Sequence, residues 1–350
     1  MVFVNGRFSP ALSRLDALPA GVRVRSLADA WSSERELLER TLGRITSFED
    51  SAFTALNTAF AQDGAVVIVD RNVEYSTPVH ALFVTNAHAA KGVSHPRNVI
   101  VLGTNAKVSV VESYVATGDT SYFTNAVTEC DVPDGATLTH YKIQRESRRA
   151  FHVGTIEARQ GRDSHYISFS FASGAALSRT NVLTLLDGEG CGSTLNGLYL
   201  ADGSQHVDHQ TRIEHAKANC FSREIYKGVL DGSAHGVFNG KVYVRPAAQK
   251  TDGKQTNNTL LLSERAKIDA KPQLEIFADD VKCTHGATIG RLDANSLFYM
   301  KSRGVSAELA RRLLTYAFAA DVLETIEVES VRVGLEAMVL KRFTGVDESS

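Results

Sequence analysis

The feature that most constrains the fold is a stretch of about 220 residues, from about 64 to 290, built from short strand-like runs without any helix-length pattern. Runs rich in β-branched residues recur at 65–69, 98–102 and 241–244, and apolar and polar residues alternate at 167–171. Turn signals follow every ten or so residues, at Gly161, Gly174, Asp187-Gly188, Asp202-Gly203, Asp231-Gly232, Gly240 and Asp252-Gly253. This length of strand and turn exceeds a usual β-sandwich.

An all-β stretch of this length must close into a large barrel or wind as a solenoid, and we favour a parallel β-helix. Polar residues inside strand-like runs, such as Asn257, Asn258 and the segment 206–215, support this fold, because stacked coils can carry ladders of polar side chains. A β-helix also needs its ends covered, since the last coil would otherwise present an unpaired edge. We expect the flanking segments to cover them.

Those flanking segments have helical periodicity, which divides the chain into a helical cap at 1–63, the β-helix at 64–290 and a helical region at 291–350. Ser26 followed by Asp29 resembles a capping box before the first helical stripe. After residue 290, Asp293 and Ser306 are predicted to cap two helices that form an αα-hairpin. A third amphipathic segment carries Val331, Leu335, Met338 and Phe343 on one face, and this region is too small to bury three such stripes by itself.

Charge and motifs argue against several classes of function. The net charge is −2, and no block of Lys and Arg suggests nucleic acid as a partner. The four cysteines, Cys130, Cys191, Cys220 and Cys283, are dispersed, which suits reduced thiols in the cytoplasm. No apolar run is long enough to span a membrane, and residues 1–7 do not resemble a secretion signal. No Walker, G-x-S-x-G or H-E-x-x-H motif is present, so we assign no catalytic residue and expect a non-enzyme.

The best candidate site is the segment 279–293, where Asp279, Asp280, Cys283 and His285 cluster at the change from strands to helices. On a strand, Cys283 and His285 point to the same face about 6.6 Å apart, which is wide for one tetrahedral ion. Ligands from a second chain, or a polynuclear cluster, would fit better. The residues alone favour structural roles instead, with Cys283 a small buried apolar side chain and His285 a turn residue, because two ligands make no metal site.

Three further histidines, His206, His209 and His215, lie close together in the sequence and are candidate metal ligands. On a strand His209 and His215 share one face and His206 takes the other, so no two occupy adjacent positions on the same face. We interpret them mainly as ladder residues of the β-helix, with metal binding as the alternative.

The motif Asp280-Val-Lys-Cys-Thr-His-Gly-Ala-Thr-Ile-Gly290, followed by Leu297-Phe-Tyr-Met-Lys-Ser-Arg-Gly-Val305, resembles the C-terminal signature of the SufD family of iron–sulfur cluster assembly proteins. Segments 53–64, 206–211, 226–232 and 240–244 are also similar, so the resemblance covers nearly the whole chain. The family usually begins with a longer helical region containing a Glu-Glu-Trp-type segment, and this chain is expected to start downstream of it.

The resemblance implies a right-handed parallel β-helix flanked by N- and C-terminal α-helical regions, acting as a non-catalytic scaffold of the SufBCD complex. It implies pairing with the related SufB through the β-helix, and docking of the ATPase SufC, which binds the ATP, through the C-terminal helices. A nascent iron–sulfur cluster would form at the SufB–SufD interface, with His285 as a transient iron ligand, Cys283 beside it and no stably bound cofactor. The isolated chain is expected to form a homodimer, since a flank that pairs with a paralogue can pair with its own copy.

Two alternatives stay open at this point. One is a SufB-like paralogue. The Cys-Thr-His-Gly motif and the small number of cysteines argue against it. The other is a carbohydrate-active β-helix enzyme that would use Asp202, Asp208, Arg212 and Glu214. We expect these charges to alternate between the two sides of the strand, and together with the absence of a secretion signal this disfavours the enzyme.

Overall fold

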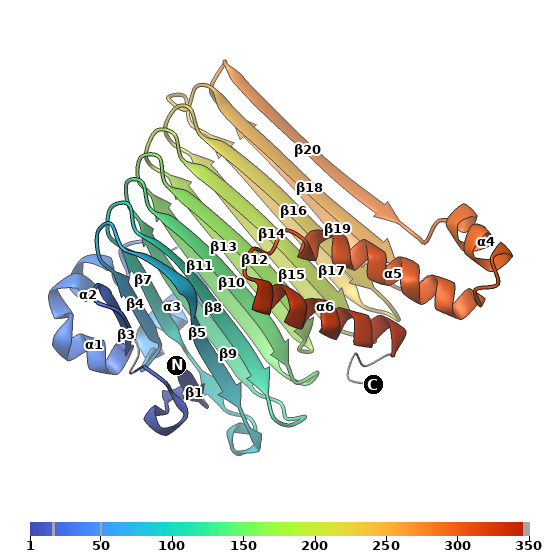
Figure 1. Ribbon diagram of the computed structural model, residues 1–350, viewed down its shortest axis with the longest axis horizontal. Coiled ribbons are helices and arrows are strands. Elements are labelled where there is room, and N and C mark those ends of the chain that lie inside the picture. The colour runs from blue at the N-terminus through green and yellow to red at the C-terminus, as the bar shows by residue number, and fades with distance from the viewer. Residues whose placement is uncertain (16–17, 50, 346–350) are drawn as a thin grey trace.

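The computed structural model describes residues 1–15, 18–49 and 51–345 and shows a β-solenoid in which two sheets of stacked parallel strands enclose the core (Figure 1). Each coil contributes one strand to each sheet. Consecutive strands of the chain therefore belong to different sheets, and each strand pairs with the equivalent strand of the next coil. This confirms the predicted parallel β-helix. Its strands are β4 (Ala65–Val69), β5 (Glu74–Thr85), β7 (Arg97–Leu102), β8 (Lys107–Ala116), β9 (Phe123–Val132), β10 (Thr137–Glu146), β11 (Phe151–Gln160), β12 (His165–Gly174), β13 (Leu177–Leu186), β14 (Gly192–Ala201), β15 (His206–His215), β16 (Phe221–Leu230), β17 (His235–Val244), β18 (Thr251–Leu261), β19 (Lys267–Ile276) and β20 (Val281–Gly290).

The N-terminal region adds short strands to the start of both sheets. The first sheet runs in the order β2-β1-β5-β8-β10-β12-β14-β16-β18-β20, where β1 (Val2–Val4) is parallel to β5 and β2 (Arg7–Phe8) is antiparallel to β1. The second runs β19-β17-β15-β13-β11-β9-β7-β4-β3, where β3 (Val22–Ser26) is antiparallel to β4, and the two-residue β6 (Val93–Ser94) also pairs with β9. The region 1–63 is therefore mixed, whereas its periodicity indicated only helices.

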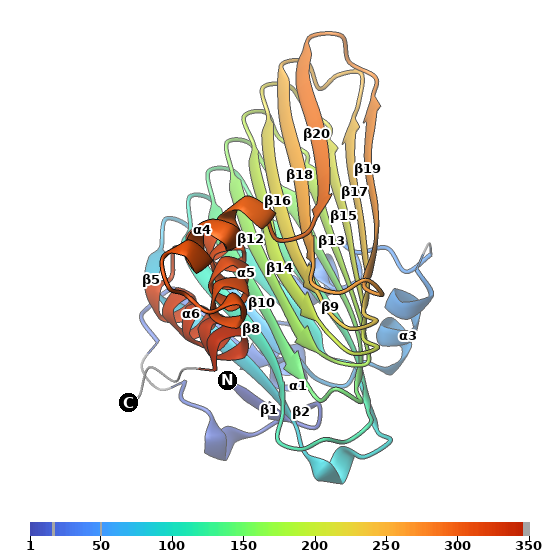
Figure 2. The ribbon, with the colours of Figure 1, turned by 90° about the vertical axis from the view of Figure 1, so that its right-hand side faces the viewer.

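Tight turns stack in rows along both edges of the solenoid (Figure 2). Several turn residues adopt the left-handed conformation, among them Asn105 and Asp163, a conformation that asparagine and aspartate tolerate better than bulkier residues. Gly188 is required for another reason: a Cβ there would lie 2.1 Å from the backbone nitrogen of Arg162 in the preceding coil. Successive turns therefore touch backbone to backbone.

The interior is apolar along most of its length but also contains charged side chains. The rings of Phe3, Phe83 and Tyr114 stack along the axis with centroids 4.7 and 4.8 Å apart. Beside them the fully buried Glu112 accepts hydrogen bonds from the Tyr114 hydroxyl at 2.8 Å and from Thr128 Oγ1 at 2.7 Å. The predicted polar ladders are thus present, and the buried Glu112 carboxylate has hydrogen-bonding partners, as burial demands.

Three N-terminal helices pack against the outer face of the second sheet: α1 (Leu27–Ser33), α2 (Arg35–Thr41) and α3 (Ala52–Phe60). Ser26 caps α1 as predicted, since its hydroxyl accepts a hydrogen bond from Asp29 N at 3.1 Å. Short 3-10 helices, η1 (Pro10–Leu12) and η2 (Ala87–Ala89), lie in the loops.

The chain ends in α4 (Ala294–Ser302), α5 (Ala307–Leu323) and α6 (Glu329–Thr344). The predicted caps are confirmed: Asp293 Oδ2 accepts from Ser296 N at 2.7 Å, and Ser306 Oγ accepts from Leu309 N at 3.2 Å. Within the described residues, no helix combines the length and apolarity needed to cross a membrane.

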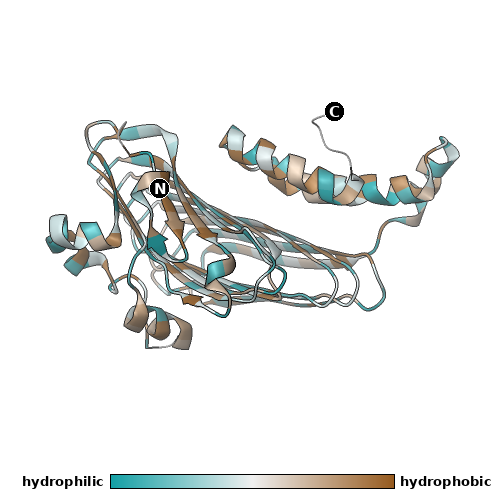
Figure 3. Cartoon of the chain, turned by 90° about the horizontal axis from the view of Figure 1, so that it is seen from below, coloured by the Kyte–Doolittle hydropathy of each residue, from teal (hydrophilic) through white to brown (hydrophobic). Residues whose placement is uncertain are grey.

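The position of the C-terminal helices differs from the prediction. Helices α5 and α6 run antiparallel to each other across the outer face of the first sheet (Figures 1 and 3). Val322 and Leu323 of α5 and Val339 of α6 belong to one buried cluster with Tyr141 and Phe169 of the sheet. The prediction that this region covers the end of the β-helix was wrong, because the apolar faces of α5 and α6 are buried against a row of large apolar side chains on the outer face of the sheet.

Candidate functional site at the open end of the β-helix

The last coil leaves the β-helix open. Strand β20 is the final strand of the first sheet and pairs only with β18, while β19 is the final strand of the second and pairs only with β17 (Figure 2). Among the described residues nothing continues either ladder. Half of the backbone N–H and C=O groups of each edge strand are therefore available to another chain.

Cys283 and His285 both lie on this edge strand. They are in register with Gly253 and Gln255 of β18, whose positions are buried toward the inside of the solenoid. Both side chains therefore belong to the inward face of β20, at the mouth of the open end, and share one face as predicted. Cys283 is half-buried and His285 is exposed.

The surroundings of the two side chains differ. Burial raises the pKa of the Cys283 thiol, whose side chain packs with Val242 and Val244. His285 has no hydrogen-bond or ion-pair partner in the described part of the chain, so its imidazole is free to bind a ligand from outside. No group of three or more His, Cys, Asp or Glu side chains capable of holding a metal ion occurs among the described residues. Within the described residues, the pair alone supplies too few ligands for a metal ion.

The two acids of the motif lie slightly apart from this pair. Asp279 and Asp280 occupy the turn before β20, both exposed, and Asp280 N donates a hydrogen bond to Gln249 Oε1 at 2.9 Å. Within the described residues, their carboxylates make no hydrogen bond with Cys283 or His285, so the structure brings together the thiol and the imidazole but not the acids.

Two buried residues that the sequence analysis did not single out lie in the same column as His285. Gln255 is its neighbour on β18, and Glu224 on β16 comes next. Gln255 Nε2 donates to Glu224 Oε2 at 2.7 Å, while one oxygen of each side chain is buried without a hydrogen-bond partner in the described structure. Burial raises the pKa of Glu224 to about 7. Identifying these two residues would have required knowing which positions of successive coils lie in register.

The histidines of β15 divide as predicted. His209 and His215 point into the solenoid and are buried, whereas His206 lies on the outer face. The His215 Nε2 atom is 3.0 Å from Ser222 Oγ, and the ring of His206 meets that of His235, with centroids 4.8 Å apart. None of these belongs to a metal-binding group within the described residues, which favours the interpretation as ladder residues.

The residues proposed for a carbohydrate-active enzyme are held in ion pairs. The expected alternation was wrong, since Asp208, Arg212 and Glu214 share the outer face of β15. Asp208 pairs with Arg179 at 3.2 Å and Glu214 with both Arg212 and Arg245. Asp202, in the preceding turn, pairs with Arg148 and with Arg342 at 2.7 Å. Each carboxylate is neutralised by an Arg, which does not suit a catalytic pair that needs one acid protonated.

A second exposed surface lies on α4, which has no buried residue. Phe298 and Tyr299 are 72% and 60% exposed, unusually high values for neighbouring aromatic side chains. They belong to the motif 297–305 noted in the sequence.

Comparison with known proteins agrees with these features. The profile described as "SUF system FeS cluster assembly, SufBD core domain" matches residues 83–318, and that described as "SufBD protein N-terminal region" matches residues 1–81. An iron–sulfur cluster assembly SufBD family protein of Synechocystis is 37% identical over 97% of this chain and 76% of its own length.

Two relatives carry the name SufD. The iron–sulfur cluster assembly protein SufD of Escherichia coli is 34% identical over 99% of this chain and 79% of its own length. The SufD of Bacillus subtilis is 30% identical, over 84% of this chain and 67% of its own length. The chain therefore belongs to the SufD branch of the SufBD family, whose members take part in iron–sulfur cluster assembly.

Proposed function

We propose that this protein is a non-catalytic scaffold subunit of a cytoplasmic SufBCD complex, and that a nascent iron–sulfur cluster forms where its open end meets SufB. One observation carries the proposal: Cys283 and His285 lie together on an unpaired edge strand that supplies too few ligands for a metal by itself. A partner strand added to β20 would complete both the sheet and the ligand set.

His285 is the side chain that we assign to the cluster. It is exposed and unpartnered, and imidazole is an accepted ligand of iron. A single histidine among ligands from another chain would be released more readily than a set of thiolates, which suits a cluster that must be handed on. Cys283, whose thiol is harder to ionise because of its burial, would act beside it.

The SufC ATPase is assigned to the C-terminal helices. Helices α5 and α6 are fixed to the first sheet by their buried faces, which leaves α4 as an exposed projection with Phe298 and Tyr299. Exposed aromatic side chains that a partner protein can bury are a common anchor for it. ATP would bind to SufC and not to this chain. In the absence of SufB, the same open end would join two copies into a resting homodimer.

The test is anaerobic co-expression of the tagged chain with SufB and SufC from the same organism, followed by native mass and by iron and sulfide analysis. We expect a complex with one copy of this chain, one SufB and two SufC that carries iron and sulfide. The His285→Ala variant should form the same complex with its iron content reduced several-fold, because one ligand is lost while the backbone pairing remains.

The matched control is His235→Ala, which removes another partly exposed strand histidine, from the outer face of β17, and should leave the iron content unchanged. Unchanged iron in the His285→Ala complex would refute the ligand role. A chain that elutes alone and iron-free beside both partners would refute the scaffold role altogether.

A further inference from the structure

Two buried thiols occupy the same position in consecutive coils. Cys191 directly precedes β14 and Cys220 directly precedes β16, and the residues that follow them, Gly192 and Phe221, are register partners. Phe221 N donates a hydrogen bond to Cys191 O at 3.0 Å. Both cysteines are buried, at 0% and 1% exposure. At the usual spacing of hydrogen-bonded strands, their Cα atoms are about 4.8 Å apart.

The two thiol groups meet at a shared acceptor. Cys191 Sγ lies 3.0 Å from Gly188 O, and Cys220 Sγ lies 3.2 Å from the same oxygen. Cys191 Sγ also lies 2.9 Å from Gly161 O of the preceding coil. The sulfur atoms therefore point into the same small space beneath the turn that contains Gly188.

Their protonation is unequal. A hydrogen bond from the Cys220 thiol lowers the pKa of Cys191, and the same hydrogen bond, together with burial, raises the pKa of Cys220. Cys191 is thus the sulfur that ionises first, held beside a thiol that keeps its proton. A nucleophilic thiolate with a second thiol in reach is the arrangement found in redox-active cysteine pairs.

We propose that Cys191 and Cys220 form a redox-active pair that closes into a disulfide bond between two consecutive coils. Their Cα spacing lies within the range of about 4.4–6.8 Å that disulfides require. The oxidant would be a small disulfide or a peroxide. With a small disulfide, the Cys191 thiolate attacks one sulfur and releases one thiolate. The Cys220 sulfur then attacks the mixed disulfide and releases the second, and the two protein protons pass to the two small thiols.

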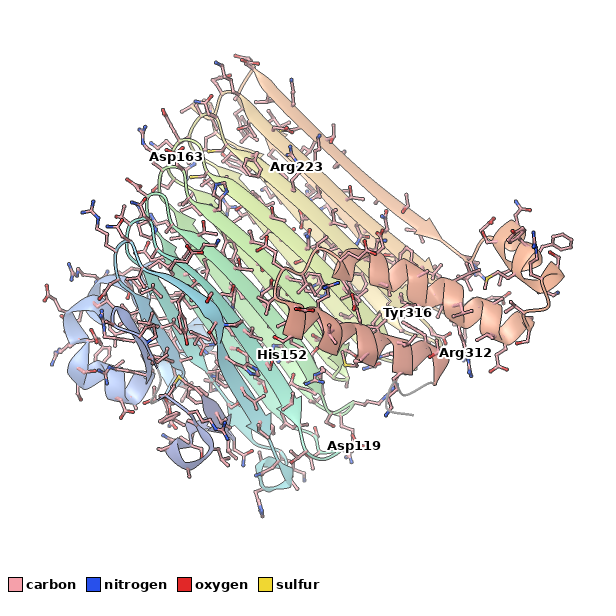
Figure 4. The ribbon with its side chains drawn as sticks, viewed as in Figure 1. Asp119, His152, Asp163, Arg223, Arg312 and Tyr316 are labelled. Atoms are coloured by element: carbon pink, nitrogen blue, oxygen red, sulfur yellow. The ribbon has the colours of Figure 1, made fainter. Side chains whose placement is uncertain are left out.

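The pair lies close to the surface even though both thiols are covered. The covering turns include Glu189, Lys217 and Asn219, all exposed. The turn of Glu189 rests on that of Asp163, whose backbone N–H donates to Glu189 O at 2.8 Å, in the row of turns at the edge of the solenoid (Figure 4). Local opening of one surface turn would admit a small oxidant without disturbing the core.

The other two cysteines have no such neighbour. Cys130 lies in register between Ile100 and Ala158, and Cys283 is in register with Gly253. The proposal is also independent of the cluster scaffold, because the register places neither Cys191 nor Cys220 on the open edge strand. Its outcome would leave the role of His285 untouched.

The experiment counts free thiols in the full chain. The reduced, folded protein is treated with diamide, whose N=N bond takes up two electrons and two protons, and is then unfolded and alkylated. We expect two alkylated cysteines instead of four, a peptide map that joins the segments containing Cys191 and Cys220, and recovery of all four after dithiothreitol. A Cys283→Ser background removes disulfides formed between chains through the exposed end, leaving one alkylated cysteine after diamide.

Variants sharpen the result. Cys130→Ser should still lose two thiols to diamide, whereas Cys191→Ser and Cys220→Ser should lose none within the chain. If either of these variants fails to fold, the peptide map of the wild-type chain decides alone. Four free thiols after diamide, or a bond within one chain that uses Cys130 or Cys283, would overturn the proposal.

Discussion

Glu129 is a buried carboxylate that holds the loop between α2 and α3 against the β-helix. It accepts hydrogen bonds from three backbone amides of the loop, Gly43 N at 2.8 Å and Ile45 N and Thr46 N at 3.1 Å. Arg97 Nε donates to it at 3.0 Å, and the exposed fractions of the two side chains are 2% or less. An acid in such a setting cannot be removed without leaving the Arg97 charge and three amides unsatisfied.

We therefore predict that Glu129→Ala lowers the free energy of unfolding by about 3–5 kcal/mol, as expected when a buried ion pair loses one partner. Urea titration followed by circular dichroism measures the loss. The control is Glu74→Ala, which breaks an exposed pair with Lys107 at 3.2 Å and should cost less than about 1 kcal/mol. Equal losses in the two variants would contradict the role assigned to Glu129.

His209 makes the stability depend on pH. Its ring lies between those of Tyr199 and Tyr226, with centroids 5.1 and 5.3 Å away, and neither nitrogen has a hydrogen-bond partner in the described structure. Burial, and secondly the charge of Lys142, lowers its pKa to about 3 from 6.5. Because the folded pKa lies below the unfolded one, its contribution to stability is present above pH 6.5 and is lost as the pH falls toward 3.

His209→Phe removes this titration while it keeps an aromatic ring in the site. Relative to the wild type, we predict that the variant gains about 2 kcal/mol of unfolding free energy between pH 7.5 and pH 5, measured by urea titration at each pH. His88→Phe, at an exposed position, should follow the wild-type profile. A pH-independent difference between His209→Phe and the wild type would show that His209 does not titrate as described.

Among single residues, the sequence identified those that cluster along the chain and missed those brought together only by coil stacking. Cys283 and His285 were singled out as candidates because they lie two residues apart within one motif. Glu224 and Gln255 are 31 residues apart and meet only because one coil lies on the next. Cys191 and Cys220 looked dispersed for the same reason. Because the sequence has no visible repeat, the length of each coil could not be predicted. The residues that lie in register on successive coils therefore could not be predicted either.

Among secondary-structure elements, local chemistry predicted the boundaries well. Ser26, Asp293 and Ser306 each cap the helix that follows, because a hydroxyl or carboxylate there satisfies a free amide of the first turn. The short strands β1, β2 and β3 were missed. Each has five residues or fewer, which is too short to show a hydrophobic period. They form strands because β5 and β4 provide backbone hydrogen-bonding partners for β1 and β3.

Strand β20 is the element on which the proposed association depends. Ile289 on this strand is 53% exposed although it is apolar, as expected for a position that a partner covers. We predict that Ile289→Asp weakens binding to SufB, and any homodimer, at least tenfold, because the interface would have to bury a carboxylate without a partner. Titration by light scattering or by biolayer interferometry measures the change.

The control for this variant is Val333→Asp on α6, which places the same charge at a side chain that is 48% exposed. It should leave binding to SufB unchanged. Both variants should unfold at nearly the wild-type temperature, since neither side chain is buried in the isolated chain. Full binding by Ile289→Asp would show that β20 is not the contact edge.

At the scale of the whole molecule, a central β-helix between two helix-containing regions was predictable, but the strands of the first region and the position of the last region were not. The run of strands and turns is too long for a sandwich, which leaves a large barrel or a solenoid, and the polar residues inside the strand-like runs favoured the parallel β-helix. Where α5 and α6 dock depends on the outer apolar row formed by Tyr141, Phe169 and Leu198. These residues belong to three different coils and form a surface only once the coils have stacked.

The difference between the two ends of the solenoid bears on how far assembly can proceed. At the N-terminal end, β3 is antiparallel to β4 and β2 is only two residues long, so the described residues present no coil-length parallel edge there. Stacked strands that are free at both ends can polymerise into fibrils, since each added subunit renews the growing tip. Among the described residues, only the end formed by β19 and β20 offers such an edge, and in the proposed pairing SufB or a second copy occupies it. The proposed pairing would thereby limit to two subunits a backbone that could otherwise template a filament.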